Sequence, residues 1–341
     1  MVIKLYNKKS KQELINNLNL ESFKRITCSF YNYIPIESPQ ALRDHIYSIF
    51  ESLKIFGRVY IASEGVNAQI SVPDYFWVKF IEEIKKIKSI KNIPIKKAVN
   101  EGTSFYKLVV KVKKEIVAYG LSEDLYDMNQ VGQYLNHREF NEAIEEESTI
   151  VIDMRNFYES EVGRFKNAEI PLVEKSKELL PEVRRMLNGR EDNQVLLYCT
   201  GGIRCEKASS YLIKSGVNNV KQLHGGIIQY AHDIRKDGIK SKFIGKNFVF
   251  DSRLGERITD DVIADCHNCG KPSDNHDDCN YDACHILFIQ CVGCSTKLDG
   301  CCSEECKENA SKPIEEQKEM RKDPKNIIKK RYFRSPKNYR E

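Results

Sequence analysis

Hydrophobic positions in the first third of the chain form short alternating segments around two helical patterns. The alternation over residues 26–30 is typical of a strand with one buried face. Helical spacing of apolar side chains follows over residues 38–53 and again from Pro73. The other segments expected to be extended are 58–62, 68–72, 93–95 and 107–112. The order βαββαβ predicts a ferredoxin-like α+β sandwich over residues 1–120.

Between residues 121 and 245 the pattern changes to apolar runs that alternate with helices. The segments expected as core strands are 149–152, 195–198 and 220–223. The segments expected as covering helices are 178–187 and 206–215. Asn129 is expected to cap a further helix that carries Val131 and Leu135. This alternation predicts a parallel α/β domain, in which ligands gather at the carboxyl ends of the strands.

The strand predicted at 195–198 leads into a short loop that carries a cysteine. The loop consists of Cys199, Thr200, Gly201, Gly202, Ile203, Arg204 and Cys205. A thiol between a strand end and a helix N-terminus lies among unpaired N–H groups, which favour the thiolate. The glycines let the backbone curl around the sulfur, and Arg204 can hold an anionic or polar ligand above it. We therefore expect Cys199 to be an ionised and accessible nucleophile, the alternative being a buried, inert cysteine.

Residues 246–312 are distinguished by their cysteines, nine of which lie between positions 266 and 306. The pairs Cys266-x2-Cys269 and Cys291-x2-Cys294 have the spacing that presents two sulfurs to one tetrahedral metal. Cys279, Cys284, the pair Cys301-Cys302 and Cys306 could supply a second centre, and His267, His276 and His285 are spare candidates. The ligands expected there are Cys279, Cys284, Cys302 and Cys306. Spacing does not fix which ligands pair. Because so polar a segment cannot build its own apolar core, structural zinc is expected to stabilise it.

Composition changes this picture mainly through what it excludes. At 341 residues the chain is long enough for two or three domains. No apolar run reaches the length of a membrane span, and the first residues lack the apolar region of a signal peptide. We therefore expect a cytoplasmic protein whose twelve cysteines are metal ligands or reactive thiols rather than disulfides. No nucleotide-binding or flavin fingerprint stands out.

Positive charge is concentrated in two blocks. Residues 85–115 hold ten lysines against two glutamates, and residues 319–341 hold nine lysines and arginines against three acids. Blocks of this size suit a polyanionic partner such as RNA. The alternative is a solvated charged face followed by a disordered basic tail over residues 313–341.

The loop from Cys199 to Arg204 resembles the active-site loop of rhodanese domains, which carry a persulfide on the cysteine. Four residues separate the two side chains, as in the sulfurtransferases of this superfamily, whereas the related phosphatases use a loop one residue longer. Asp153-Met-Arg155 stands where rhodanese domains carry an Asp-x-Arg element, for which we expect a supporting salt bridge. The resemblance implies a rhodanese-like fold for the central domain.

Over nearly its whole length the chain resembles the rhodanese-related tRNA uridine 5-hydroxylases. The matching segments are 57–69, 152–156, 198–209, 245–251, 285–291 and 300–306. The resemblance implies hydroxylation at C5 of the wobble uridine in the tRNA anticodon loop, with O₂ as co-substrate. The thiolate-favouring position of Cys199 motivates a hypothesis for this reaction: Cys199 adds to uracil C6, or it bears a persulfide or other oxidised sulfur that transfers or activates oxygen. Arg204 and the loop N–H groups would stabilise charge on the uracil oxygens.

Two other functions stay open at this point. A plain sulfurtransferase would use the same loop to move sulfane sulfur from thiosulfate or a protein persulfide to an acceptor. A non-catalytic RNA-binding scaffold would leave the activated cysteine without a purpose. Cys205 is either a thiol that resolves an oxidised Cys199 or a packed neighbour. The sequence indicates neither the electron donor nor the oligomeric state.

Overall fold

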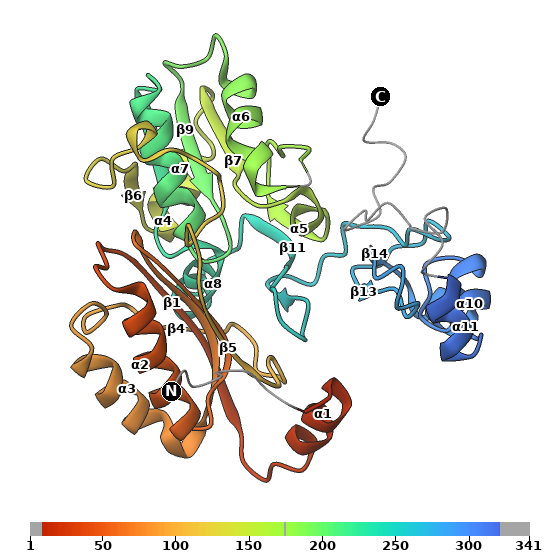
Figure 1. Cartoon of the computed structure of the whole chain (residues 1–341). Coiled ribbons are helices and arrows are strands. Elements are labelled where there is room, and N and C mark those ends of the chain that lie inside the picture. The colour runs from red at the N-terminus through yellow and green to blue at the C-terminus, as the bar shows by residue number, and fades with distance from the viewer. Residues whose placement is uncertain (1–8, 174, 321–341) are drawn as a thin grey trace.

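The computed structural model describes residues 9–173 and 175–320, which form three regions (Figure 1). In Figure 1 the N-terminal sandwich lies below the central domain, and the cysteine-rich region lies to the right. Helix α1 (Lys11–Asn19) precedes the first sheet and was not expected from the sequence. It begins with a capping box, in which Ser10 and Glu13 each accept the other's backbone N–H.

A five-stranded sheet forms the core of the N-terminal region. Its strands, in spatial order, are β4 (Lys96–Lys97), β1 (Arg25–Tyr33), β3 (Gly65–Pro73), β2 (Phe56–Ala62) and β5 (Leu108–Val112). Neighbouring strands pair antiparallel, except that β2 and β5 run parallel. The order β4-β1-β3-β2 confirms the predicted ferredoxin-like sandwich, and β5 extends its edge.

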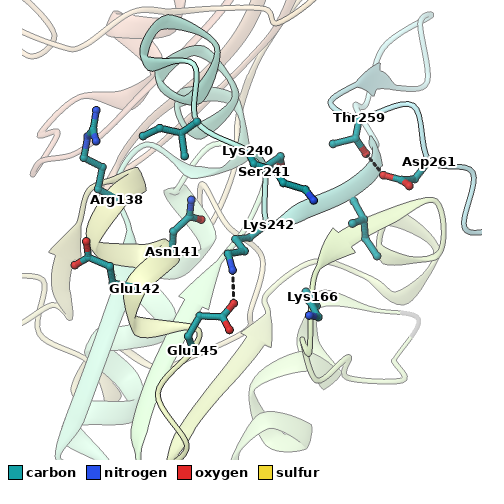
Figure 2. Close-up of a pocket in the computed structure, with 12 residues that line it drawn as sticks. Arg138, Asn141, Glu142, Glu145, Lys166, Lys240, Ser241, Lys242, Thr259 and Asp261 are labelled. Carbon is teal, nitrogen blue, oxygen red and sulfur yellow. Dashed lines mark hydrogen bonds and ion pairs between the residues drawn. The ribbon is translucent and has the colours of Figure 1, made fainter.

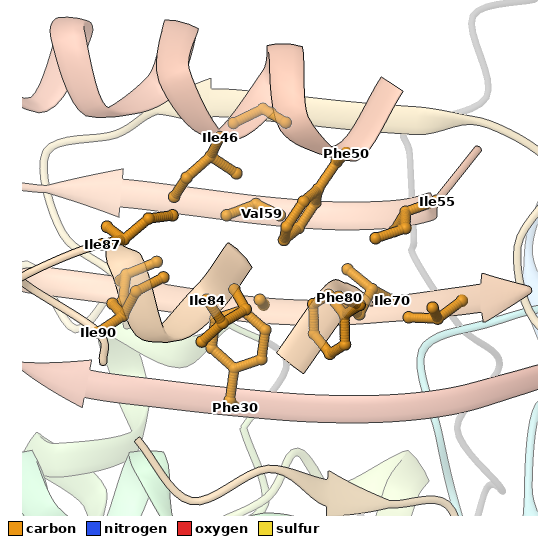
Figure 3. Close-up of a cluster of buried hydrophobic side chains, with 14 of the residues drawn as sticks. Phe30, Ile46, Phe50, Ile55, Val59, Ile70, Phe80, Ile84, Ile87 and Ile90 are labelled. Atoms are coloured by element: carbon orange, nitrogen blue, oxygen red, sulfur yellow. The ribbon is translucent and has the colours of Figure 1, made fainter. Parts of the chain in front are cut away.

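Helices α2 (Pro39–Ser52) and α3 (Trp77–Lys86) cover one face of this sheet. Figure 3 shows the buried cluster between them, with Phe50 from α2 and Phe80 from α3 packed over the strands. Because side chains alternate along a strand, the second face carries polar and aromatic residues. That second face contacts the central domain, where Tyr31 donates a hydrogen bond to Glu206 at 2.6 Å.

Four parallel strands form the central sheet. In spatial order they are β6 (Gln133–Leu135), β10 (Asn219–Leu223), β9 (Gln194–Tyr198) and β7 (Thr149–Asp153). The helices of this domain are α4 (His137–Ala143), α5 (Phe157–Glu161), α6 (Ser176–Leu187), α7 (Ile203–Lys214) and α8 (Gly226–Asp237). The predicted parallel α/β domain is therefore confirmed.

The prediction of a helix that begins after Asn129 is wrong. Gln133–Leu135 forms strand β6, and the helix begins only after Asn136, whose side chain accepts the backbone N–H of Glu139 at 3.1 Å. Glu139 accepts the Asn136 N–H in return, which completes a capping box at that position. The N–H of Asn129 instead donates to Asp127 within a turn. The capping box of Asn136 and Glu139 sets the start of the helix, even though apolar residues with helical spacing occur before it.

The remaining elements are short strands and helices distributed over the three regions. A small sheet joins β8 (Gly163–Phe165), β11 (Phe243–Asn247) and β12 (Glu256–Arg257), and β13 (His276–Asp278) pairs with β14 (Leu287–Ile289). The short helices are η1 (Asp74–Phe76), η2 (Glu123–Leu125), α9 (Val292–Leu298), α10 (Glu304–Ala310) and α11 (Ile314–Met320). Most of the predicted basic tail, 321–341, lies outside the described residues. Among the described helices, none is both long and apolar enough to cross a membrane.

Candidate active site

The cysteine loop follows β9, every residue of which is buried. Helix α7 begins at Ile203, so the loop is shorter than the helical pattern indicated. Gly202 has a φ of 97°, and its N–H donates to the Cys199 sulfur at 3.1 Å. A Cβ at position 202 would lie 2.8 Å from the Tyr31 hydroxyl. Both the backbone conformation and this close approach therefore require glycine.

The surroundings of Cys199 favour its thiolate. Burial acts to raise the pKa of this thiol, but a hydrogen bond from Cys205, the charge of Arg204 and backbone N–H groups outweigh burial and lower the pKa to about 5. Burial, together with the same hydrogen bond, raises the pKa of Cys205 well above its ordinary value. The loop thus holds a thiolate next to a protonated thiol that donates to it.

The expectation that Cys199 is accessible is wrong for this structure. Cys199 is 0% exposed, and its neighbour Gly201, rather than the sulfur, lines the adjacent cavity. The N-terminal domain supplies part of the cover. Lys96 Nζ donates to the Gly201 carbonyl oxygen at 2.7 Å, and the Tyr33 hydroxyl donates to the Ile203 carbonyl oxygen at 3.1 Å. Motif reading within one domain could not show this cover, because it comes from strands more than a hundred residues away.

Arg204 is fixed by a carboxylate that sequence reasoning missed. Its guanidinium donates to both oxygens of Glu159 at 2.6 and 2.9 Å, and to the Thr200 hydroxyl at 3.2 Å. Glu159 is fully buried in α5, where it also accepts the backbone N–H of Asn156. A two-pronged pair of this kind sets the plane of the guanidinium beside the thiolate. The Asn-x-x-Glu capping box directly after β7 is the sequence signal that could have identified Glu159.

Asp153 and Arg155 form a fully buried ion pair, with a distance of 2.7 Å between Arg155 NH2 and Asp153 Oδ2. Asp153 Oδ2 also accepts the hydroxyls of Tyr198 and Ser160, each at 2.7 Å. Arg155 donates to the Gly163 carbonyl oxygen at 2.6 Å. These bonds join the ends of β7 and β9 to the start of β8. They therefore stabilise the end of β9, which the cysteine loop follows.

A buried lysine joins the helix behind the loop to the N-terminal domain. Lys207 on α7 is 0% exposed, and its Nζ lies 2.9 Å from a carboxylate oxygen of Glu64 and 2.9 Å from one of Glu115. Glu64 lies between β2 and β3, where it also accepts the Ile116 N–H and the Tyr126 hydroxyl. Because a buried charge is costly to leave unpaired, this network fixes the two domains against each other.

Two cavities differ in their relation to the loop. The one beside it has a volume of about 540 Å³ and is lined by all three regions of the chain, including Thr200 and Arg204. The other, about 1160 Å³, lies around α4 and β11, and none of its lining residues belongs to the loop. Figure 2 shows that its charged groups partly pair with each other, as Lys242 does with Glu145. The smaller cavity is therefore the candidate substrate site.

The eight cysteines predicted as metal ligands gather in two groups of four. The first group is Cys266, Cys269, Cys291 and Cys294, and the second is Cys279, Cys284, Cys302 and Cys306. Within each group the sulfur atoms lie within 4.8 Å of one another, and all are free thiols. The Cys269–Cys291 and Cys284–Cys302 sulfur distances of 3.7 Å suit a tetrahedron with metal–sulfur bonds of about 2.3 Å. Both donor sets therefore fit a four-coordinate metal.

The spare histidine candidates do not join these groups. His267 instead places its Nε2 2.8 Å from the Glu161 carboxylate on α5, which ties the first cysteine group to the central domain. Cys301 is buried but belongs to neither group. The fold thus groups the eight cysteines in a way that spacing left open, and their role as metal ligands stays a prediction.

The low pKa of Cys199 predicts a pH-dependent contribution to stability. The folded value of about 5 lies below the ordinary value of 9.0, so this contribution is full above about pH 9 and is lost as the pH falls toward 5. In denaturant unfolding, the free energy of unfolding of wild type should therefore increase relative to that of a Cys199→Ser variant as the pH rises from about 5 to about 9. A stability difference that stays flat across the range would contradict a native thiolate.

Three family models match consecutive parts of the chain. The UPF0176 acylphosphatase like domain matches residues 25–116, the rhodanese-like domain matches 136–233, and the rhodanase C-terminal model matches 244–307. A Leptospira interrogans protein named tRNA uridine(34) hydroxylase is 48% identical over 319 residues, which cover 93% of this chain and 87% of that protein. The chain belongs to the tRNA uridine(34) hydroxylase family. This membership confirms the resemblance inferred from the sequence motifs.

Other members and a solved structure are also similar to the chain. A tRNA uridine(34) hydroxylase of Enterobacter sp. (strain 638) is 46% identical over 320 residues, covering 93% of this chain and 91% of the relative. A crystal structure of a rhodanese-related protein from Thermoplasma volcanium matches with 20% identity and a TM-score of 0.26, covering 33% of this chain and 97% of that one. Within the family, the Cys199 loop falls in the rhodanese-like domain. The domain boundaries given from the sequence stay a prediction.

Proposed function

We propose that this chain hydroxylates C5 of uridine 34, the wobble position of the tRNA anticodon loop, and forms 5-hydroxyuridine with O₂ as co-substrate. The observation that carries the proposal is the Cys199 thiolate beside Arg204 and a cavity, in a chain 48% identical to a protein named tRNA uridine(34) hydroxylase. The names of the relatives do not favour the sulfurtransferase alternative.

The proposed chemistry begins with the sulfur at Cys199. Addition of this sulfur to uracil C6 forms a C–S bond and moves the π electrons to C5 as an enolate, whose oxygens Arg204 and the loop N–H groups stabilise. C5 then takes an oxygen atom from a peroxide-level donor, whose O–O bond breaks and releases water. Loss of the C5 proton and of the sulfur restores the ring. Two electrons from a thiol reductant bring O₂ to the peroxide level.

Burial of Cys199 bears on which sulfur reacts. Its Sγ has no exposed surface, whereas Thr200 and Gly201 reach the cavity. A persulfide extends the side chain by one S–S bond of about 2.0 Å, so its terminal sulfur lies farther from the buried Sγ. We therefore favour a persulfide over the bare thiolate as the reacting form. The Cys199 thiolate would form it by taking the sulfane sulfur of thiosulfate and releasing sulfite, which also accounts for a rhodanese-like loop in a hydroxylase.

The charge around the cavity supports RNA as the partner. Lys96 and Lys113, both from the basic block at 85–115, line the cavity. Lysine side chains bind the backbone phosphates of nucleic acids through their positive charge. A wobble base lies in a single-stranded loop, so it can be turned out of its stack into a pocket at a cost of only a few kcal/mol.

We further propose zinc for the two groups of four cysteines. Four thiolates leave no open coordination position, which is the arrangement of structural rather than catalytic zinc. The metal would supply folding free energy to the small region that links α5 to the C-terminal helices. A reducing cytoplasm would keep these thiols, and Cys199, free of disulfides.

Purified protein incubated with unmodified tRNA, thiosulfate as the sulfane-sulfur donor, a thiol reductant and air tests the proposal. Mass spectrometry of the digested tRNA should find 5-hydroxyuridine at position 34. Sulfur transfer from thiosulfate to cyanide, unaffected by tRNA and without this nucleoside, would instead establish a plain sulfurtransferase. Salt-sensitive tRNA binding with neither product would establish a scaffold.

A further inference from the structure

One wall of the cavity is the polar face of the N-terminal sheet. Two rows of directly opposed residues cross strands β1, β3 and β2 on this face: Tyr31, Asn67 and Tyr60, then Ser29, Gln69 and Arg58. All six line the cavity of about 540 Å³. This volume falls within the range of about 300–1,000 Å³ that small-ligand sites occupy. The wall therefore offers side chains of defined register to a ligand of nucleoside size.

The first row lies directly against the cysteine loop. The Tyr31 hydroxyl, which donates to Glu206, would lie 2.8 Å from a Cβ at position 202. Asn67 is directly opposite Tyr31 on the neighbouring strand, and Arg204 lines the same cavity. A planar ring placed between this wall and the loop would thus contact side chains of both rows.

The two amides on this wall differ in their freedom to turn. Asn67 Nδ2 donates a long hydrogen bond of 3.4 Å to the Ile116 carbonyl oxygen, which orients the amide and leaves Oδ1 as an acceptor. The Gln69 amide makes no hydrogen bond to any other residue of the described ranges 9–173 and 175–320. Both residues are only half-buried. Asn67 therefore offers a ligand a fixed hydrogen-bond acceptor. The Gln69 amide can rotate and offer either its N–H donor or its carbonyl acceptor.

We propose that this cavity holds the extruded uracil, with Asn67 Oδ1 accepting the N3–H of the base and Gln69 bonding an adjacent carbonyl oxygen. Tyr60, in register with Asn67, adds an aromatic ring to the same wall, with Lys113 Nζ 5.4 Å from its centroid. The inference rests on the proposed function and names the residues that select its substrate. Among the described residues, neither amide forms a hydrogen bond with the cysteine loop. We therefore assign both residues to substrate specificity rather than to catalysis.

The fixed amide explains a choice of uridine over cytidine. Uracil carries a donor at N3, whereas cytosine carries a lone pair there, which would face the Asn67 oxygen. Gln69 turns over to suit either the O4 acceptor of uracil or the amino group of cytosine. Asn67 therefore sets the preference between the two bases, and Gln69 contributes affinity for both.

The test measures binding of the full-length protein to two anticodon stem-loop RNAs that differ only in U34 or C34. Fluorescence anisotropy at one salt concentration should show wild type preferring U34 by about 5- to 150-fold, the range of one good base contact. Asn67→Ala should bring the ratio close to one, and Asn67→Asp, which keeps the acceptor, should retain a preference for U34. Gln69→Ala should weaken binding of both RNAs equally.

Asn32→Ala is the matched control, because Asn32 lies on β1 and bonds the Ser89 carbonyl oxygen outside the cavity. This variant should bind both RNAs as wild type does. A wild type without preference, or an Asn67→Ala variant that keeps it, would overturn the assignment of the pocket. If wild type nevertheless forms 5-hydroxyuridine, the proposed function stands and only the pocket is wrong. Absence of that product would refute the function itself, whatever the binding ratio.

Discussion

Cys199→Ala should lower 5-hydroxyuridine formation by at least about 10³-fold, the scale of losing a reacting nucleophile. Cys205 should not replace the sulfur, because it is buried, and burial, which does not depend on the Cys199 side chain, raises the pKa of its thiol. The measurement is mass spectrometry of tRNA from cells that lack the native protein and express the variant at the wild-type level. The variant should still bind tRNA, since the lysines and the sheet wall are unchanged.

Cys205→Ala is the matched comparison for this loss. Cys205 donates to the Cys199 thiolate and helps lower its pKa, so its removal should raise that pKa and move the activity optimum to higher pH without abolishing the product. A Cys199→Ala variant that still forms the nucleoside would remove this sulfur from the mechanism. Equal, complete loss in both variants would show that the two thiols act as a redox pair instead.

Cys266→Ala should abolish one of the two metal centres and unfold the region around it. Each group supplies four thiolates, and apparent zinc-binding free energies of about 10–16 kcal/mol in small zinc domains show how much stability depends on a complete set. We expect bound zinc to fall from two atoms per chain to one. Limited proteolysis should then cut first within the cysteine-rich region, and the thermal midpoint of the protein should fall.

Cys301→Ala provides the control, since Cys301 is buried near the second group but belongs to neither. It should keep both zinc atoms and resist proteolysis as wild type does. Purified wild-type protein without stoichiometric metal, or a Cys266→Ala variant that keeps both atoms, would contradict the assignment. Disulfide bonds within the groups under reducing conditions would do so as well.

Features with a local physical cause could be predicted from the sequence. The strand, glycine turn and helix around Cys199 follow one another over residues 194–214, so the thiolate-favouring position follows from their order alone. The two Cys-x2-Cys pairs likewise bring their sulfurs together by spacing. The ferredoxin-like order was predicted because each strand and helix keeps its own period of apolar residues.

Features that depend on contact between distant segments could not be predicted in this way. Part of the cover of Cys199 comes from another domain, where Lys96 and Tyr33 bond the Gly201 and Ile203 carbonyl oxygens, so no pattern around the loop indicates it. The division of the eight cysteines into two groups of four depends on how the cysteine-rich region folds together. Glu159 is intermediate, because its capping box is local but its pairing with Arg204 is not.

Heavy-isotope dioxygen tests the central claim most directly. Purified protein, unmodified tRNA, thiosulfate and a thiol reductant would react under labelled O₂ in ordinary water, with Cys199→Ala as the parallel control. The account predicts a heavy oxygen atom in 5-hydroxyuridine at position 34 for wild type and none for the variant. Uridine 34 left unmodified, or a product that carries sulfur in place of oxygen, would contradict it.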